Sequence, residues 1–281
     1  MTPGMQDVAF GADPNGPPTA FDTMRPMTAA GPGAAGSSRG GPYYSPSATS
    51  LVREARMAGL LYLAVAVFGA FAQIVRLQVY APDDAATTAA NIVAHATLVR
   101  LSFVADLVQA LVWLVLAMVL YRMLRHADRA LARAMVIFVV VSVGIAMLNM
   151  VFQLGALLVA TTPAYAGALG GGGSHAVVLL LMNLQHYGYL IAQLSWLWLF
   201  AIGLLGYRSG VFPRALSVLL MLATVCYMVD ALLQFMVPSL ANASANVFVL
   251  PETLCEVSLL AYLLIKGIRT PRLDVATLAT K

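Results

Sequence analysis

Charged residues are scarce in this chain of 281 residues, and their scarcity excludes an ordinary water-soluble fold. Asp, Glu, Lys and Arg together make up 10% of the residues, whereas hydrophobic residues make up 60%. Soluble domains carry about 25% charged residues, so this chain has too few polar side chains to cover a soluble surface. We therefore predict a membrane protein, with the lipid bilayer as its first partner.

Cysteine and the common catalytic motifs are nearly or wholly missing. The two cysteines, Cys226 and Cys255, lie within apolar segments, which favours small buried residues over a disulfide framework or a metal site. The sequence has no HExxH or Walker motif, and it has no paired histidines to ligate haem between helices. We expect no metal and no cofactor. The scattered Lys and Arg residues also argue against nucleic acid as a partner.

Apolar segments are missing from residues 1–50, which are dense in Gly, Pro, Ser, Thr and Ala. Such a segment cannot bury enough surface to offset the entropy cost of ordering, so we predict a disordered tail. The tail also lacks the apolar core of a signal peptide, so we expect the first apolar segment to insert uncleaved. We divide the chain into this tail, a membrane domain at 51–268 and a short second tail at 269–281.

Six apolar segments follow the tail, and each is near the roughly 20 residues that a helix needs to cross a bilayer. They predict an all-α bundle of six transmembrane helices. The apolar sequence before the fourth segment indicates that this helix can start near Ala176. The segments lie near 57–79, 98–121, 134–160, 187–206, 213–236 and 247–267.

A short amphipathic helix is predicted between the first two segments. Asp83 or Asp84 would serve as its N-cap, because a carboxylate there accepts hydrogen bonds from the first free N–H groups. Its apolar face is predicted to hold Ala85, Ala89, Ile92 and Val93.

Lys and Arg are absent from alternate connections, at 80–97, 161–175 and 237–246. Cytoplasmic loops are enriched in Lys and Arg, so both termini are predicted to lie in the cytoplasm, with the protein in the bacterial inner membrane. The three connections without basic residues are expected to be flexible outer loops. The basic connections carry Arg122, Arg125, Arg129 and Arg133, and then Arg208 and Arg214.

Several short sequences stand in a fixed order along the membrane domain: ARMAGLLYL, PDDAATTAANI, LVRLSFVADLVQ, LYRMLR, HYGYLIAQ, GYRSGVFPRAL, YMVDALL and CEVSLLAYLLIKG. In order and spacing they resemble a bacterial family of six-helix integral membrane proteins described only as a domain of unknown function. The resemblance covers roughly residues 55–267. It implies the same six-helix fold and supplies no catalytic residues.

Polar side chains inside the apolar segments indicate where a function would lie. A charged side chain at the bilayer centre costs about 2.5–3.5 kcal/mol on insertion scales, so these groups are expected to face the bundle interior. Counting residues from the helix ends places them in the outer half of the membrane. The candidates for ligand binding or a proton pathway are Arg76, Arg100, Asp106, Gln153, His186, Asp230, Glu252 and Glu256.

Helical spacing aligns further polar groups with these candidates, because residues three, four or seven apart share a face. The aligned sets include Tyr62, Gln73 and Arg76; Asp106, Gln109 and Trp113; and Asn149 and Gln153. We predict a polar chamber, with Glu256 the best candidate for a carboxyl that is protonated at neutral pH. The alternative is purely structural: Arg76 pairs with Asp106 or Glu252, and amides join neighbouring helices. Trp196 and Trp198 are interpreted as packing or lipid-facing residues.

Three classes of function remain open. The first is binding or transport of a small polar or amphipathic molecule in the outward-facing chamber. The second is an intramembrane enzyme acting on a lipid or isoprenoid, with Glu256 or Asp230 as general acid and a neighbouring carboxylate as base. The third is a scaffold that holds protein partners, whose identity the sequence does not indicate. We favour the first class, because the candidate residues gather towards the outer side.

Overall fold

The computed structural model describes residues 48–267, and every regular element in this part of the chain is an α-helix. Six helical stretches are long and apolar enough to cross a membrane, which confirms the all-α bundle and makes the chain a multi-pass integral membrane protein. The predicted tails lie outside the described residues, except that the first helix begins inside the first tail. The helices are α1 (Ala48–Val79), α2 (Ala85–Ala94), α3 (Ala96–Leu124), α4 (Arg129–Thr161), α5 (Pro163–Gln193), α6 (Leu197–Ser209), α7 (Arg214–Met236) and α8 (Pro238–Ile265).

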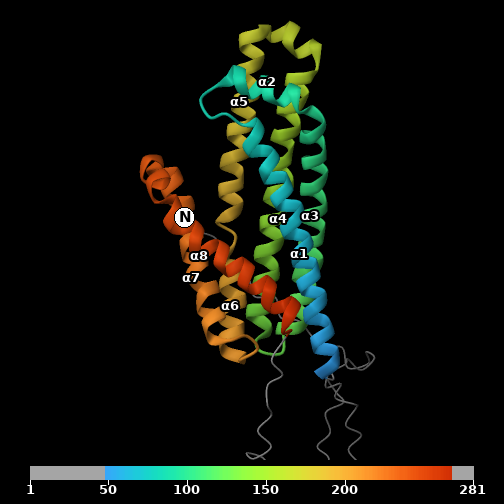
Figure 1. The fold of residues 1–281 in the computed structure, drawn as a ribbon, viewed down its shortest axis with the longest axis vertical. Coiled ribbons are helices and arrows are strands. Elements are labelled where there is room, and N and C mark those ends of the chain that lie inside the picture. Colours follow the sequence, from blue (N-terminus) through green and yellow to red (C-terminus); the bar gives the residue numbers. More distant parts are fainter. Residues whose placement is uncertain (1–47, 268–281) are drawn as a thin grey trace, which may run out of the picture. The chain divides into compact units, whose positions relative to one another are not determined.

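The helices pack against one another in a ring, so the last helix contacts the first. Helix α3 packs between α1 and α4, α4 packs against both α5 and α6, α7 lies between α6 and α8, and α8 returns to α1. Gly59 of α1 lies against Leu264 of α8, where an added Cβ would come within 2.9 Å of the Leu264 backbone nitrogen. From this crossing α1 and α8 diverge (Figure 1). The two helices therefore meet closely at one end only.

Two apolar clusters hold the helices together. The larger one joins helices of both halves of the chain and includes Leu120, Met135, Ile202 and Leu263. The smaller one joins α1, α2, α3, α4 and α5 and includes Val75, Ile92, Val99, Leu157 and Met182. On α1, the residues of the larger cluster lie between Ala55 and Val65, and those of the smaller cluster are Val75 and Val79. Residues between these positions are thus left for a polar site.

The fourth span is discontinuous, whereas one continuous helix was predicted there. Helix α5 ends at Gln193 and α6 begins at Leu197, and residues 194–196 between them form a tight turn in which Ser195 and Trp196 donate to the carbonyls three residues back, Ala192 and Gln193 (Figure 1). Helix breaks usually coincide with Pro or Gly, and Leu194, Ser195 and Trp196 are neither. The break therefore had no local sequence signal.

Two of the connections predicted as flexible loops are helical. Helix α5 starts at Pro163, inside the Gly-rich connection at 161–175, and has a kink at Gly170, where φ is 71°. Helix α8 starts at Pro238, inside the connection at 237–246. The prediction was wrong because proline favours the first turn of a helix and alanine has the highest helix propensity. The Pro and Gly content alone suggested loops.

The short helix α2 joins the first two spans. Asp84 is its N-cap: its carboxylate accepts hydrogen bonds from the Thr87 backbone N–H at 2.9 Å and from the Thr87 hydroxyl at 2.7 Å. Ala89 and Ile92 are buried, whereas Val93, predicted to share their face, is 53% exposed. These two hydrogen bonds hold the pKa of Asp84 below its usual value of 3.8.

The Asp84 cap makes the order of α2 depend on pH. Because the folded-state pKa is lowered, the stabilisation is fully present above the unfolded pKa, near 3.8, and is lost as pH falls through the lower folded pKa. We expect hydrogen exchange in the first turn of α2 to quicken over this acidic range, after correction for the intrinsic rate. Asp84→Asn keeps the cap without a titrating group, so its exchange should not respond to pH in this way. An equal response in both proteins would contradict the assignment.

Candidate functional site

A cavity of about 410 Å³ lies between the two apolar clusters. Its wall is formed by side chains of α1, α3, α4, α5, α6 and α8 and by Trp196 at the break in the fourth span. This volume lies within the roughly 300–1,000 Å³ typical of small-molecule sites. The polar and aromatic wall residues are Tyr62, Gln73, Arg76, Asp106, Gln109, Trp113, Ser142, Asn149, Gln185, Tyr189, Trp196, Trp198 and Glu256.

Unpaired polar atoms gather on the residues of this wall. Five wall residues each carry a buried side-chain polar atom that has no hydrogen-bond partner within residues 48–267. Leaving such a group unpaired costs about 1–3 kcal/mol, and folded proteins pair nearly all of them. Four other such atoms of the described chain lie elsewhere, on Gln153, Gln193, Ser217 and Glu252, so the cavity wall holds the larger share. The five atoms of the wall are Tyr62 Oη, Trp113 Nε1, Ser142 Oγ, Asn149 Oδ1 and Trp198 Nε1.

The three tryptophans of the chain all line the cavity. Trp113 packs edge-to-face against Trp196 and Trp198, with ring centroids 6.2 and 5.7 Å apart. Tyr189 packs in the same way against Trp196, and Tyr62 against Trp198. The sequence interpretation of Trp196 and Trp198 as packing or lipid-facing residues missed their place on the wall. Trp198 is only 3% exposed.

Glu256 supplies a carboxylate next to these rings. Tyr227 donates a hydrogen bond to Glu256 Oε1 at 2.9 Å, and the Tyr227 ring packs edge-on against Trp196 with centroids 4.6 Å apart. In the described part of the chain no Lys or Arg forms an ion pair with Glu256. Glu256 Oε2 also accepts no hydrogen bond from these residues, so it is available to a molecule in the cavity.

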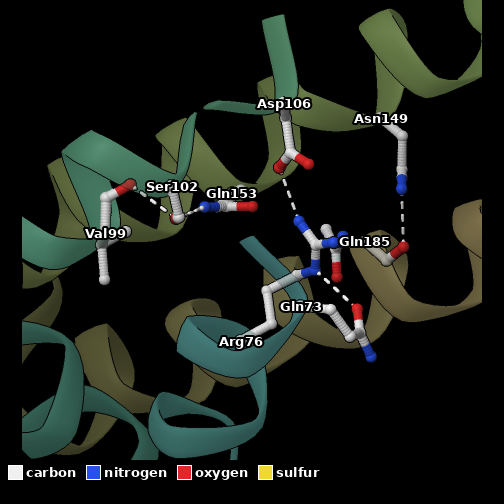
Figure 2. A network of polar contacts seen from close by, with 8 residues as sticks. All are labelled: Gln73, Arg76, Val99, Ser102, Asp106, Asn149, Gln153 and Gln185. Atoms are coloured by element: carbon white, nitrogen blue, oxygen red, sulfur yellow. Dashed lines mark hydrogen bonds and ion pairs between the residues drawn. The ribbon is translucent and has the colours of Figure 1, made fainter. Parts of the chain in front are cut away.

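A buried ion pair lies further along α1, on the α2 side of the cavity. Arg76 Nη1 of α1 donates to Asp106 Oδ2 of α3 at 2.5 Å, and Arg76 Nε donates to Gln73 Oε1 at 3.1 Å (Figure 2). The two charged side chains are only 12% and 10% exposed. Of the two partners considered for Arg76 from the sequence, the structure selects Asp106.

The cavity reaches the surface of the protein between α1 and α8. Ala66, Ala70 and Gln73 on α1 line the cavity and are exposed. Val257 on α8 also lines it and is 58% exposed. These residues lie where the two helices have diverged from their crossing at Gly59. The opening therefore lies on the side of the bundle.

Asn149 and Gly188 set the distance between α4 and α5 at the cavity. Asn149 Nδ2 donates to the backbone carbonyl of Gln185 at 2.7 Å (Figure 2). A Cβ added to Gly188 would overlap the side-chain oxygen and carbon of Asn149. Only glycine leaves room for this amide between the two helices.

Gly188→Ala should therefore destabilise the protein by about 1–3 kcal/mol, the usual cost of overpacking a filled interior. The added methyl must displace Asn149 and break its hydrogen bond to Gln185. Thermal unfolding of the detergent-solubilised protein measures the effect. Gly172→Ala is the matched control on the same helix, because nothing lies within 4 Å of its added Cβ. Equal melting temperatures for the two variants would contradict the packing argument.

Two of the predicted site residues, Gln153 and Arg100, lie away from this cavity. Gln153 Nε2 donates to Ser102 Oγ at 2.9 Å, and the Ser102 hydroxyl donates to the Val99 carbonyl at 2.9 Å (Figure 2). Arg100 is exposed and borders, with Gln153, a separate pocket of about 140 Å³ with a mainly apolar wall. Gln153 thus joins α3 to α4. This is the structural role that the sequence analysis offered for amides, as hydrogen bonds between neighbouring helices.

Three other predicted residues do not line the cavity either. His186 stacks on Tyr80, with ring centroids 6.0 Å apart. Asp230 accepts a hydrogen bond from Gln234, one turn further along α7, at 2.8 Å. Glu252 is buried, and its Oε1 has no partner among the described residues.

The structure therefore brings together Arg76, Asp106 and Glu256 from the predicted set. Helical periodicity had aligned Tyr62 and Gln73 with Arg76, and Gln109 and Trp113 with Asp106, and all four line the cavity, as does Asn149, which was aligned with Gln153. Sequence reasoning missed Ser142, Gln185, Tyr189, Trp196 at the break and Trp198 in α6. Tyr189 lies three residues after His186 on α5, so the same periodicity could have found it.

Comparison with protein families gives a match over most of the chain. A family model described as a domain of unknown function (DUF4386) matches residues 57–267. The matched region contains every residue that lines the cavity. Comparisons with curated proteins and with solved structures give no match.

Proposed function

Because this chain belongs to the DUF4386 family, whose description names no activity, we propose a function from the cavity itself: binding, as a step of transport, of a small polar or amphipathic molecule. The observation that carries this proposal is the cavity of about 410 Å³ and its wall of thirteen polar and aromatic side chains, five of which also hold a buried polar atom without a partner in the described chain. Such a wall can hydrogen-bond a polar group while its rings pack against the apolar part of the same molecule.

The break in the fourth span supports transport in particular, because Trp196 lines the cavity from the turn between α5 and α6. In membrane transporters, substrate sites are typically formed by discontinuous helices, because rigid parts can rock around such a site. The lateral opening between α1 and α8 favours an amphipathic molecule that reaches the cavity from the bilayer.

We favour binding over acid–base catalysis because the cavity holds one carboxylate without a basic partner. Asp106 is paired with Arg76, and the other carboxylates considered as catalytic partners, Asp230 and Glu252, do not line the cavity. The enzyme alternative requires one carboxyl as general acid and a neighbouring carboxylate as base, both within hydrogen-bond reach of the reacting atoms. Of the two orientations in the membrane, we propose the one that places α2 on the outer side, since the connection around α2 lacks Lys and Arg.

Native mass spectrometry of the detergent-purified full-length protein tests the proposal, with Ser142→Ala as the diagnostic variant. The wild-type protein should retain a small molecule. The Ser142 hydroxyl is fully buried and unpaired, so its removal should leave the ligand-free protein as stable or up to about 1–3 kcal/mol more stable, while retention falls.

Ser102→Ala is the matched control, because Ser102 is equally buried but its hydroxyl is paired with Gln153 and Val99. This variant should lose stability and keep the bound molecule. If Ser142→Ala instead loses as much stability as Ser102→Ala and retention does not change, Ser142 is an ordinary packing residue and the proposal fails.

A further inference from the structure

We infer that the bound molecule is an organic cation, a substituted ammonium compound that also carries an oxygen acceptor, held between Glu256 and the surrounding aromatic rings. This inference rests on the proposed function and names the ligand class of the same cavity. Charge, ring chemistry and hydrogen-bonding capacity each support it.

The charge balance of the cavity is the first support. Arg76 is the only Lys or Arg on the wall, and it is bound to Asp106. In the described chain, the one hydrogen bond that Glu256 receives comes from the neutral hydroxyl of Tyr227. An anion buried in a membrane protein needs a partner charge or a proton, and no basic side chain of the described chain supplies that charge to Glu256. A cationic ligand would supply it. Without a ligand, Glu256 would hold the proton predicted from the sequence, and binding of a cation would release that proton.

The rings around Glu256 are the second support. Tyr227 contacts both the Glu256 carboxylate and the ring of Trp196, so the carboxylate and the aromatic cluster form one site. Tyr62 and Tyr189 line the same cavity, and Tyr189 is 38% exposed, so part of its ring surface is open to a ligand. Ammonium groups are attracted to the electron-rich faces of such rings, and aromatic cages recognise quaternary ammonium in this way. A neutral ligand could donate a hydrogen bond to Glu256 but would lack both the charge–charge and the cation–π attraction.

The unpaired indole groups are the third support. Trp113 Nε1 and Trp198 Nε1 are donors only, and neither has an acceptor among the described residues. A bare ammonium ion would leave both without a partner. Both N–H groups have almost no accessible surface, so a hydroxyl, ester or carbonyl oxygen a few bonds from the ammonium group would pair with one of them once the indole ring turns towards the cavity. Amino alcohols and their esters have this chemistry.

Intrinsic fluorescence is a direct readout, because all three tryptophans line the cavity. The purified full-length protein is titrated with choline and, separately, with 3,3-dimethyl-1-butanol, the neutral carbon isostere of choline. Choline should change the tryptophan emission saturably, and the isostere should bind at least about tenfold more weakly. E256Q should weaken choline binding by at least about tenfold and leave the weak binding of the isostere unchanged.

A second variant guards against a folding defect in E256Q. Tyr189→Leu removes a partly exposed ring, and it should weaken choline binding more than isostere binding. Equal binding of choline and its isostere would overturn the inference and leave the proposed function intact. A neutral or anionic molecule retained in native mass spectrometry, with no response to choline, would do the same. No retained molecule and no response to either probe would overturn both.

Discussion

Arg76→Gln should destabilise the protein by about 3–5 kcal/mol, because it leaves the Asp106 carboxylate buried without its cation. The two charges are joined at 2.5 Å, and both side chains are nearly nine-tenths buried. Asp106→Asn should cost a similar amount, since it strands the guanidinium instead. The double variant should lose clearly less than the sum of the two single changes, because neither charge is then left alone. Thermal unfolding in detergent, across all four proteins, gives the coupling free energy.

A second ion pair in the chain serves as a control for this double-mutant comparison. Glu54 of α1 and Arg122 of α3 form this ion pair between the same two helices, with Arg122 Nη2 2.7 Å from Glu54 Oε1. Their side chains, however, are 24% and 59% exposed. Solvent-exposed pairs contribute about 0–1 kcal/mol, so Arg122→Gln should have little effect. If Arg76→Gln is as mild as Arg122→Gln, water must screen the Arg76 pair. The cavity would then be open to bulk solvent at this position.

Periodicity predicted which faces turn inward, but it could not predict which inward faces meet. Arg76 and Asp106 were both placed on inward faces from their sequence neighbours alone. Their pairing depends on α1 packing against α3, a tertiary contact that no local pattern contains. Composition and segment length, in contrast, were sufficient for the six spans, because the bilayer allows few ways to satisfy backbone polar groups.

Depth along the helix separated residues that shared a predicted face. Asn149 and Gln153 lie one turn apart on α4, yet Asn149 lines the cavity and Gln153 bonds to Ser102. Glu252 and Glu256 lie one turn apart on α8, and only Glu256 lines it. In both helices a rise of about 6 Å carries the side chain past the end of the cavity. Sequence spacing assigns a face but does not mark where a cavity ends.

Small and aromatic residues gave the weakest sequence signals. Ser142 is one serine within a long apolar run, and nothing nearby distinguishes a ligand group from interhelical packing. Trp196 was interpreted as a packing or lipid-facing residue, because the break in the fourth span has no Pro or Gly to mark it. Its position on the cavity wall follows from that break.

Trp196→Ala should be among the most damaging single changes in the membrane domain, with a loss of about 3–5 kcal/mol and no measurable ligand retention. Trp196 packs edge-on against Trp113, Tyr189 and Tyr227, so its removal takes one ring contact from each. Within a bilayer the surroundings of an unfolded helix are already apolar, so the loss comes from packing rather than from the hydrophobic effect. Unfolding in detergent and native mass spectrometry provide the two measurements.

Phe200→Ala is the control for this change, because Phe200 lies one turn further along, on α6, and is 39% exposed. A ring that faces lipid is replaced by lipid chains when it is removed, so this variant should stay within about 0.5 kcal/mol of the wild type. A wall residue has no such replacement, since the cavity beside it only grows. If the two variants lose equal stability, Trp196 must face lipid, and the aromatic wall next to Glu256 would lose its central ring.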